Sequence, residues 1–324
     1  MLRWGLIGTA RINRAIIGVL RESTRGELRA VASRRADTAT AYAAEWSIPH
    51  ALSPYDALLE RDDIDAVYIG LPNTMHVEWT VRALDAGKHV LCEKPLALTP
   101  EGVDEIAAAA ARNHRVAAEG FMYRHHPLTR TVLDTIDRGQ LGTIRSIRGA
   151  FTFLLKGRSP DIRMDPALGG GSLWDVGCYP VSYACLVTNA QPLEVFGCQA
   201  ADANGVDLSF SGIMRFDEGV LAQFDSGFQS TYRSDMEIVG SDGALRVEQP
   251  FKAGPDSRLV LVRGDERVYL PFIADPSYAG ELADFTASAL DGAPHPLPLS
   301  ESRRTARVLT ALYASAASNM PVTL

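Results

Sequence analysis

The sequence predicts an α/β protein in two parts, a doubly wound parallel sheet followed by an α+β domain with an open, mainly antiparallel sheet. Through the first 120 residues, short apolar runs alternate with alanine-rich helical stretches, which is typical of parallel strands covered by helices on both faces. From Thr143 onward, apolar and polar residues alternate with period two, as in strands with one buried face. The length of 324 residues fits two domains, which we place at residues 1–121 and 122–324.

Five strands and five helices are expected to alternate in the first domain. Thr99 is placed to cap a helix that begins at Pro100, and Gly87 can end the preceding helix in a left-handed conformation. The strands are predicted at Arg3–Ile7, Leu28–Ser33, Ala66–Leu71, His89–Glu93 and Val116–Glu119, and the helices at Asn13–Arg21, Asp37–Trp46, Ser53–Glu60, His76–Ala86 and Pro100–Asn113.

The second domain is expected to begin with a helix at Leu128–Arg138 and to continue as antiparallel hairpins. Asp217-Glu218-Gly219 and Asp242-Gly243 are turn signals, so the strands that flank each of them should pair. Strands are predicted at Leu208–Phe216, Val220–Phe228, Met236–Val239, Ala244–Val247, Leu259–Val262 and Arg267–Leu270, and the last helices at Tyr278–Leu290 and Glu301–Asn319.

One of these strands shows the expected one-sided burial in detail. Because successive side chains of a strand point to opposite faces, one set should be buried and the other exposed, with Ile213 as an exception. The core set is Leu208, Phe210, Met214 and Phe216, and the solvent set is Asp207, Ser209, Ser211 and Arg215.

Composition and charge exclude several classes of protein. With 32 basic and 39 acidic residues the net charge is −7, so no broad basic surface for nucleic acid is expected. No apolar run approaches the ~18 residues of a membrane span, and no secretory leader is apparent at the N-terminus. Four cysteines without a C-x-x-C pair favour a reducing compartment and no zinc. We therefore expect a cytoplasmic protein whose partner is a small molecule, with no metal.

The first predicted strand leads through Gly8-Thr9-Ala10-Arg11-Ile12-Asn13 into a helix. A dinucleotide pyrophosphate needs a tight turn, close approach of the backbone and the free N–H groups of a helix N-terminus. Gly8 supplies the turn and Ala10 a small residue, whereas Asn13 replaces the usual third glycine. A plain strand-to-helix turn would also explain this weakened fingerprint, but its place in the first βα unit favours a nucleotide. The residues expected at the cofactor are Gly8, Thr9, Ala10, Arg11 and Ile12.

The end of the second strand distinguishes the two nicotinamide cofactors. An acidic residue here would bind the ribose 2′-hydroxyl of NAD, whereas a cation accommodates the 2′-phosphate of NADP. The strand ends in Ser33-Arg34-Arg35, with no carboxylate before Asp37. Although a pair of solvated arginines is the plain alternative, a hydroxyl and a guanidinium favour NADP(H), with NAD(H) possible.

Lysine is scarce in this chain, at four of the 32 basic residues, so a lysine at a strand end needs a reason. Glu93-Lys94-Pro95 closes a parallel strand at the carboxyl edge, where such sheets bind ligands. An ion pair that ends the strand is the plain alternative. However, an ammonium can donate protons and change its pKa when partly buried, which a guanidinium cannot. The Lys94–Pro95 bond could be cis. We place Glu93, Lys94 and Pro95 at the cofactor.

Further candidate residues follow other strands and a glycine run. Gly169-Gly170-Gly171 permits close approach of a ligand, and Asp175 and Tyr179, four residues apart, share a helix face. A structural turn with a surface Asp and a core Tyr is the plain alternative. His125 and His126 are expected to be surface histidines rather than metal ligands. Leu71, Pro72, Asn73 and His76 are expected beside the nicotinamide ribose, and Arg124 is expected at the substrate.

Taken together, three motifs resemble the Gfo/Idh/MocA family, the group of glucose-fructose oxidoreductase and inositol dehydrogenase. These are Gly8-x-Ala10, Glu93-Lys94-Pro95, and the glycine run followed by Asp175-x-Gly177-x-Tyr179. The resemblance implies a Rossmann domain and a C-terminal domain whose open sheet often forms oligomer contacts, in a homodimer or tetramer. It also implies hydride transfer between NAD(P) and a carbinol or ketone of a sugar or related polyol.

The same resemblance implies roles for individual residues. Lys94 is then the catalytic lysine, with Asp175 and Tyr179 at the substrate, where Arg124 and Arg163 would bind polar groups. Many relatives carry His where this chain has Tyr179; Tyr is similar to the branch with dihydrodiol and NADP-dependent xylose dehydrogenases. Two further segments are similar to that branch: Phe121-Met122-Tyr123-Arg124 and Arg163-Met164-Asp165-Pro166.

Two alternatives to a sugar or diol dehydrogenase stay open. A nucleotide-sugar ketoreductase would need only more room beside the second domain. A redox sensor that binds NADP(H) without turnover belongs to another class, and Lys94, Asp175 and Tyr179 argue against it because a sensor has no need of proton-transfer groups.

Overall fold

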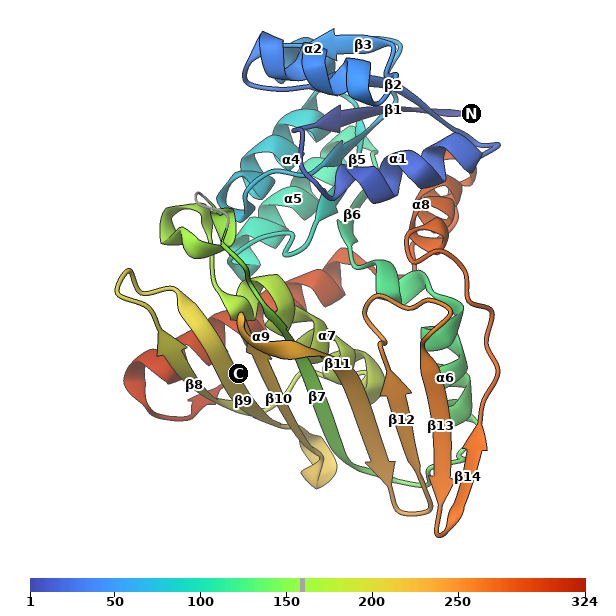
Figure 1. Ribbon diagram of the computed structural model, residues 1–324, viewed down its shortest axis with the longest axis vertical. Helices are drawn as coiled ribbons and strands as arrows, with labels where there is room; N and C mark the ends of the chain where they lie inside the picture. The colour runs from blue at the N-terminus through green and yellow to red at the C-terminus, as the bar shows by residue number, and fades with distance from the viewer. Residues whose placement is uncertain (158–160) are drawn as a thin grey trace. The chain divides into compact units, whose positions relative to one another are not determined.

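The computed structural model describes residues 1–157 and 161–324, which divide into two compact units. The first unit comprises Met1–Phe121 and Tyr278–Arg303, and the second comprises Met122–Ser277 and Arg304–Leu324. Figure 1 labels the elements of both. We propose the division at residue 121 as the boundary of two folding domains, with residues 278–303 added to the first because they pack on its core.

The first unit is built on a six-stranded parallel sheet with the order β3-β2-β1-β4-β5-β6, so the predicted doubly wound sheet is confirmed. The short strand β3 was not predicted, because three residues are too few to show a pattern. The strands are β1 (Leu2–Ile7), β2 (Gly26–Ala32), β3 (His50–Leu52), β4 (Ala66–Ile69), β5 (His89–Glu93) and β6 (Ala117–Gly120).

Helices cover this sheet on two sides. α1 and α8 pack together beside β1, while α4 packs against α5 and against β4 and β5 (Figure 1). Thr99 accepts a hydrogen bond from the Gly102 N–H, and Gly87 adopts φ +75°, so both predicted helix ends are confirmed. The helices are α1 (Asn13–Glu22), α2 (Ala36–Glu45), α3 (Asp56–Leu59), α4 (His76–Asp85), α5 (Pro100–Asn113) and α8 (Ala279–Asp291), with a 3₁₀ turn η1 (Asn73–Met75).

The C-terminal segment belongs to the core of the first unit through α8. Phe285 is fully buried, and its ring centroid lies 5.1 Å from that of Trp4 on β1. Leu282 and Tyr68 belong to the same buried cluster. Burial of such large side chains contributes on the order of 2 kcal/mol each, which fixes α8 on the sheet although about 160 residues separate it from β6.

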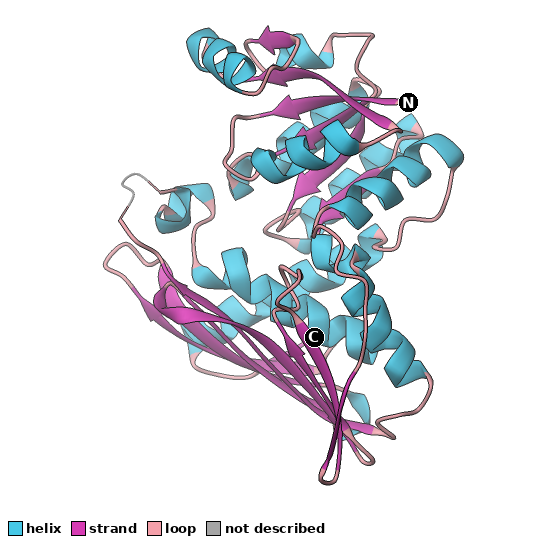
Figure 2. Ribbon diagram, turned by 45° about the vertical axis from the view of Figure 1, so that its right-hand side comes forward, coloured by secondary structure: helices cyan, strands magenta, loops and turns pink. Residues whose placement is uncertain are grey.

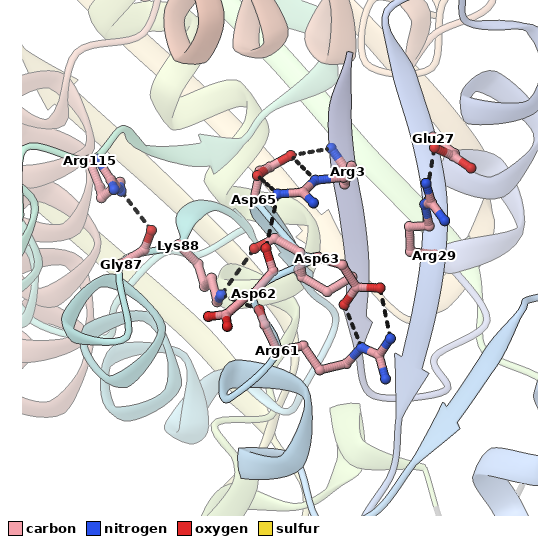
Figure 3. Close-up of polar contacts among 11 residues, drawn as sticks. Arg3, Glu27, Arg29, Arg61, Asp62, Asp63, Asp65, Gly87, Lys88 and Arg115 are labelled. Carbon is pink, nitrogen blue, oxygen red and sulfur yellow. Dashed lines mark hydrogen bonds and ion pairs between the residues drawn. The ribbon is translucent and has the colours of Figure 1, made fainter.

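Ion pairs and carbonyl contacts join the amino ends of the strands, as Figure 3 shows. The Arg3 backbone N–H and its Nε donate to Asp65 Oδ2 at 2.9 and 2.8 Å, which links β1 to the start of β4. Lys88 is buried before β5, and its Nζ donates to the carbonyl oxygens of Arg61 and Ile64 at 2.6 and 3.0 Å. Lys88 is therefore a structural lysine at the edge opposite the carboxyl ends of the strands.

The second unit is built on a nine-stranded sheet with the order β14-β13-β12-β11-β7-β10-β9-β8-β15. Its paired strands are antiparallel except for β10 and β7, which confirms the open, mainly antiparallel sheet. The strands are β7 (Ile144–Leu154), β8 (Glu194–Ala201), β9 (Asp207–Arg215), β10 (Leu221–Gly227), β11 (Gln229–Gly240), β12 (Ala244–Glu248), β13 (Arg258–Arg263), β14 (Glu266–Tyr269) and β15 (Val322–Thr323).

Figure 2 shows helices along one face of this sheet and no helix along the other among the described residues. Both predicted hairpins are confirmed, since β9 pairs with β10 and β11 pairs with β12. Ile213, the exception to the predicted alternation, lies 51% exposed on the uncovered face. The helical elements are η2 (Met122–His125), α6 (Pro127–Asp137), η3 (Ile162–Met164), η4 (Pro166–Leu168), η5 (Leu173–Gly177), α7 (Cys178–Thr188), η6 (Asp217–Gly219) and α9 (Leu299–Ser318), with α9 in the second unit from Arg304.

Asp207 corrects the prediction that it faces solvent, because its side chain is 1% exposed. The cause is an irregularity in the pairing of β9 with β8. Ala200 pairs with Ser209, but Ala201 pairs with Asp207, so β9 holds an extra residue at Leu208. An extra residue in one strand exchanges the faces of the side chains beyond it, which places Asp207 on the buried side.

Candidate active site

The turn after β1 has the geometry that a phosphate needs. Gly8 adopts φ +96°, and a Cβ there would lie 2.8 Å from the Gly70 carbonyl oxygen, so only glycine fits. α1 begins at Asn13 without an acidic residue in its first turn, so no carboxylate of its own repels an anion there. The N–H groups of Asn13, Arg14 and Ala15 donate to the carbonyl oxygens of the turn that precedes them. Thr9, Ala10, Arg11 and Ile12 in this turn are partly or fully exposed.

Asn13 takes over the position of the missing third glycine. Its side chain is fully buried, and Nδ2 donates to the Gly8 carbonyl oxygen at 2.9 Å. This hydrogen bond joins the first residue of α1 to the first residue of the turn. The departure from the glycine fingerprint is thus compensated by a local hydrogen bond.

The end of β2 presents one arginine that is not committed to a carboxylate in the described contacts. Arg35 Nε donates to Asp37 Oδ1 at 3.0 Å, Nη2 contacts the other oxygen, and the Arg35 guanidinium holds the pKa of the Asp37 carboxyl well below its usual range. Arg34 is exposed beside the buried Ser33. The acid nearest to this strand end is thus neutralised, and a hydroxyl and a guanidinium remain. This donor set fits a 2′-phosphate better than a 2′-hydroxyl.

His76 joins the two loops that follow β4 and β5. The ring is fully buried, with Nδ1 2.8 Å from the Pro95 carbonyl oxygen and Nε2 2.9 Å from that of Leu71. Burial lowers the pKa of His76, and the positive charge of Lys94 acts in the same direction. Both ring nitrogens face the protein's own backbone. Pro72 and Asn73, between these anchor points, are partly exposed.

Glu93 and Lys94 are both partly buried at the carboxyl end of β5, and the Lys94–Pro95 bond is cis. The Tyr68 hydroxyl on β4 donates to Glu93 Oε1. Glu281 on α8 is fully buried, and burial and the charge of Glu93 raise its pKa well above the usual range. The sequence reasoning missed Tyr68 and Glu281, because one lies inside a strand and the other almost 200 residues away.

Tyr179 lies in an aromatic cluster of the second unit. Its ring centroid is 5.3 Å from those of Phe151 and Phe251 and 6.1 Å from that of Tyr123. The side chain is 3% exposed, and its hydroxyl donates to Met122 Sδ at 3.6 Å. Tilted and edge-on contacts with these rings fix the direction in which the phenol points.

Asp175 lies in a single π-helical turn, η5, directly before α7. Turns of this kind occur often at functional sites. Arg163 Nη1 lies 3.9 Å from Asp175 Oδ2, while Arg163 Nε and Nη2 donate to Asp161 at 2.9 and 2.7 Å. The hydrogen bonds with Asp161 raise the pKa of Arg163. Arg163 and Asp175, each predicted to lie at the substrate, are thus close to one another.

Arg124 is 9% exposed on the 3₁₀ turn η2. The expectation that His125 and His126 are surface residues is wrong, since they are 1% and 2% exposed. His126 caps α6, because its Nδ1 accepts from the Leu128 N–H, and Nε2 lies 3.0 Å from the Asp275 carbonyl oxygen. These two contacts hold the His126 ring inside the second unit.

Two further properties concern the described residues as a whole. Among residues 1–157 and 161–324 there is no group of three or more His, Cys, Asp or Glu side chains that could hold a metal. In the same ranges no helix is both long and apolar enough to cross a membrane.

The structure thus brings the predicted site residues together in two groups. In the first unit, Gly8, Ser33, Leu71 and Lys94 all follow neighbouring strands at their carboxyl ends, the edge at which parallel sheets bind nucleotides. In the second unit, Asp175 and the buried Tyr179 follow the glycine run, and Arg163, which precedes that run, lies beside Asp175. The first unit has the strand edge that binds a nucleotide, and the second has a phenol, a carboxylate and a guanidinium. These features define the class of a dinucleotide-dependent oxidoreductase.

Comparison with known proteins agrees with this class. The model of an oxidoreductase family with an NAD-binding Rossmann fold matches residues 2–121, and that of the GFO/IDH/MocA C-terminal domain matches residues 129–246. The chain belongs to the Gfo/Idh/MocA family. It is an NAD(P)-dependent oxidoreductase that acts on CH–OH or C=O groups.

Two curated proteins and one solved structure are similar to the chain over nearly its whole length. The chain is 34% identical to D-xylose 1-dehydrogenase (NADP(+)) 2 of Haloferax volcanii over 100% of both chains. It is 36% identical to a dTDP-3,4-didehydro-2,6-dideoxy-α-D-glucose 3-reductase of Actinomadura kijaniata, over 97% of this chain and 96% of the other. The structure of a 3-ketoreductase from Actinomadura kijaniata in complex with NADP and TDP-benzene superposes with a TM-score of 0.91 at 33% identity, over 97% of each chain.

Proposed function

We propose that this protein is an NADP(H)-dependent oxidoreductase that transfers a hydride between the nicotinamide and a CH–OH or C=O group of a sugar, polyol or related diol. The observation that carries the proposal is the donor set at the end of β2, with Ser33 buried, Arg34 exposed and Asp37 neutralised by Arg35. The likeness to an NADP-dependent xylose dehydrogenase along the whole chain supports it.

The first unit binds the cofactor in this proposal. NADP, when bound, supplies or accepts the hydride at its nicotinamide ring. The Gly8 turn and the N-terminus of α1 bind the pyrophosphate, and Ser33 and Arg34 bind the 2′-phosphate. Leu71, Pro72 and Asn73 lie beside the nicotinamide ribose. His76 supports these residues from behind rather than binding the cofactor itself, because its ring nitrogens face Leu71 and Pro95.

We propose that Tyr179 exchanges a proton with the reacting hydroxyl or carbonyl group of the substrate. Oxidation of a carbinol requires that its hydroxyl lose a proton in the step in which the hydride leaves, and reduction requires the reverse. A free phenol titrates near ~10, so it needs a nearby positive charge to ionise more readily. We assign Lys94, which is partly buried and follows directly on β5, as the positively charged residue of the first unit that takes part in this step.

Asp175 and two arginines orient the substrate. Arg163 is clamped by two hydrogen bonds to Asp161, so its position beside Asp175 is fixed before substrate arrives. Arg124 is held in a buried position on η2. We propose that Asp175 binds a substrate hydroxyl and that Arg124 and Arg163 bind other polar groups.

A nucleotide-sugar ketoreductase is the second candidate. It is favoured by the likeness to the dTDP-sugar 3-reductase and to the 3-ketoreductase bound to TDP-benzene. The clamp on Arg163 argues the other way, since a guanidinium already paired with Asp161 has less charge to offer a diphosphate. The two candidates share the reacting groups and differ in the size and charge of the substrate.

A steady-state assay over a substrate panel tests the proposal. NADPH oxidation is measured with ketosugars and nucleotide ketosugars, and NADP⁺ reduction with aldoses, polyols and diols. We expect turnover with at least one free sugar, polyol or diol. Turnover confined to nucleotide ketosugars would select the second candidate, and binding of NADPH without turnover on the whole panel would favour a sensor.

We propose a homo-oligomer, a dimer or tetramer, that forms through the uncovered face of the nine-stranded sheet. This face holds a groove of about 700 Å³ in which exposed apolar side chains such as Phe196 and Ile213 lie among polar and charged ones. Its lining includes paired charges, with Arg233 on Asp225 and Arg246 on Glu237 at 2.8 and 3.0 Å. A face with balanced charges and exposed apolar residues suits a second copy of the chain.

Light scattering after size exclusion tests this assembly. The wild type should elute as a dimer or tetramer, and Ile213→Glu should shift it to smaller species, whereas Met320→Glu, also an exposed apolar position, should not. A wild-type monomer at micromolar concentration would refute the proposal. The cytoplasmic location stays a prediction from the cysteine content.

A further inference from the structure

A buried carboxylate of the second unit serves none of the roles assigned so far. Asp207 begins β9, is 1% exposed, and meets side chains from η5 and α9. We propose that Asp207, with Tyr313 and Ser172, is the positioning group that holds the helical segment with Asp175 and Tyr179 in its reactive place. The proposal rests on the proposed function, because that function gives Asp175 and Tyr179 their roles.

Three hydrogen bonds converge on this carboxylate. Asp207 Oδ2 accepts from Ser172 Oγ and from the Leu173 backbone N–H, both at 2.8 Å, and Oδ1 accepts from the Tyr313 hydroxyl at 2.7 Å. Ser226 on β10 adds a hydroxyl 3.2 Å from Ser172 Oγ. Hydrogen bonds to an ionised acceptor inside a protein are about twice as strong as those between neutral groups.

The contact with the Leu173 N–H places the carboxylate at the start of the helical segment. N–H groups at such an end lack intrahelical partners, and a negative charge there is favourable. Burial raises the pKa of Asp207, and the hydrogen bonds from Tyr313, Leu173 and Ser172 oppose that shift. Asp207 therefore acts as a cap that comes from a distant strand.

Gly171 explains why the glycine run is needed here. Its φ is +127°, and a Cβ would lie 2.1 Å from Asp207 Oδ1 and 2.7 Å from the Tyr313 hydroxyl oxygen. The space that a side chain would fill is taken by the protein's own carboxylate and phenol. Close approach at Gly171 thus serves the anchor, whereas the sequence analysis attributed it to a ligand.

The anchor is connected to Asp175 by two short routes. The Asp175 backbone N–H donates to the Gly171 carbonyl oxygen at 3.0 Å, so the position of Gly171 sets that of Asp175. The Trp174 ring, adjacent in the chain, packs on Tyr313 with centroids 5.2 Å apart. A shift of Tyr313 or Asp207 is therefore transmitted to Asp175 through the backbone and through a ring contact.

Two substitutions each remove one of the hydrogen bonds to Asp207, and a third serves as the control. Tyr313→Phe and Ser172→Ala each take a hydroxyl away from Asp207. Ser315→Ala takes away a fully buried hydroxyl from the same helix as Tyr313, where Ser315 Oγ accepts from the Gly197 N–H and donates to the Met320 carbonyl oxygen. The control thus loses comparable bonds without touching the anchor.

The full-length variants are compared in kcat, KM and NADPH dissociation constant, and by hydrogen exchange of the peptide covering residues 169–180. We expect Tyr313→Phe and Ser172→Ala to lower kcat at least about 10-fold, because small misplacements of reacting groups are costly. NADPH affinity should stay within about twofold. Exchange in the peptide should become faster in both variants, while Ser315→Ala should match the wild type in kcat and exchange.

The outcomes separate the two proposals. Wild-type kcat and exchange in both Tyr313→Phe and Ser172→Ala would overturn the inference, as would an equal loss in Ser315→Ala. If the wild type turns over no substrate on the panel, the proposed function fails. The exchange measurement then decides the inference on its own, since protection of residues 169–180 by Asp207 does not depend on turnover.

Discussion

The two groups of candidate site residues, one in each unit, are positioned in different ways. In the first unit, the residues assigned to the cofactor follow the ends of neighbouring parallel strands, and the backbone of the sheet places them. In the second unit, the segment that leads into Asp175 is bonded by a carboxylate 34 residues from Leu173, and that carboxylate accepts from a phenol 106 residues away. A site set by strand ends can be predicted from local sequence, whereas a site set by distant side chains cannot.

The largest expected effects concern Lys94 and Tyr179, the two residues that we assign to proton transfer. Lys94→Ala and Tyr179→Phe should each lower kcat by about 10²- to 10⁴-fold, the usual contribution of a positioned acid or base. NADPH affinity should be retained in Tyr179→Phe. Steady-state kinetics with the best substrate of the panel and a fluorescence titration with NADPH measure both quantities. Near wild-type kcat in both variants would contradict their assignment.

The next effect sharpens the role of the end of β2. Arg34→Ala should lower kcat/KM for NADP⁺ by about 10- to 100-fold, since a hydrogen bond to a charged group is worth about 1.5–3 kcal/mol, and it should leave NAD⁺ unaffected. Arg112→Ala is the control, because Arg112 is an exposed arginine of the same unit that is paired with Asp85 on another helix end. Equal losses in the two variants, or a wild type that prefers NAD⁺, would show that Arg34 does not read the 2′-phosphate.

A smaller effect is expected at the link between the two loops of the first unit. The neutral His76 ring has a single N–H, so His76→Leu removes one hydrogen bond, to the carbonyl oxygen of either Leu71 or Pro95, and should lower the free energy of unfolding by about 2 kcal/mol. NADPH affinity should fall with it. Urea unfolding and a fluorescence titration measure these changes, and Glu78→Gln, exposed on the same helix, is the control. Unchanged stability and affinity would refute the link.

The last effect is a pH dependence of three histidines in the two units. Burial lowers the pKa of His76 and His126 and lowers that of His89 to about 4. At these three side chains the unfolded chain therefore binds more protons than the folded chain below about pH 6.5, whereas the raised pKa of Glu281 acts in the opposite direction. The contribution of the histidines to stability should be fully present above that pH and decline as pH falls, by up to about 1.4 kcal/mol per pH unit for each histidine.

Urea unfolding between pH 4.5 and 7.5 checks this sign. His89 Nδ1 accepts from the Val116 N–H, so His89→Asn should flatten the decline by the contribution of one group. A His89→Asn variant whose stability changes with pH as steeply as that of the wild type would contradict the assignment of His89 as buried and neutral.

The sequence predicted the features that arise from local patterns. The parallel sheet, both hairpins, the Thr99 cap and the left-handed Gly87 are confirmed, because strand period and capping act over a few residues. The strand β3 and the inward turn of His126 were missed, since a three-residue strand and a histidine cap carry no distinct signal.

The anchor of the second unit was beyond local reasoning for a physical reason. An extra residue in β9 exchanges the faces of the strand, so a period-two pattern assigns Asp207 to the wrong side. Tyr313 lies in an alanine-rich helix where nothing nearby marks it as a hydrogen-bond donor. Glu281, buried near the charge of Glu93, is equally invisible in the sequence.

Transfer of a deuteride label tests the central claim most directly. NADPH carrying deuterium at the reactive nicotinamide position is incubated with the wild type and with Tyr179→Phe in the presence of the carbonyl substrates of the panel, and the products are weighed by mass spectrometry. The account predicts a product heavier by one deuterium with the wild type and about 10²-fold less of it, or lower still, with Tyr179→Phe. Cofactor binding without label in any product would contradict it.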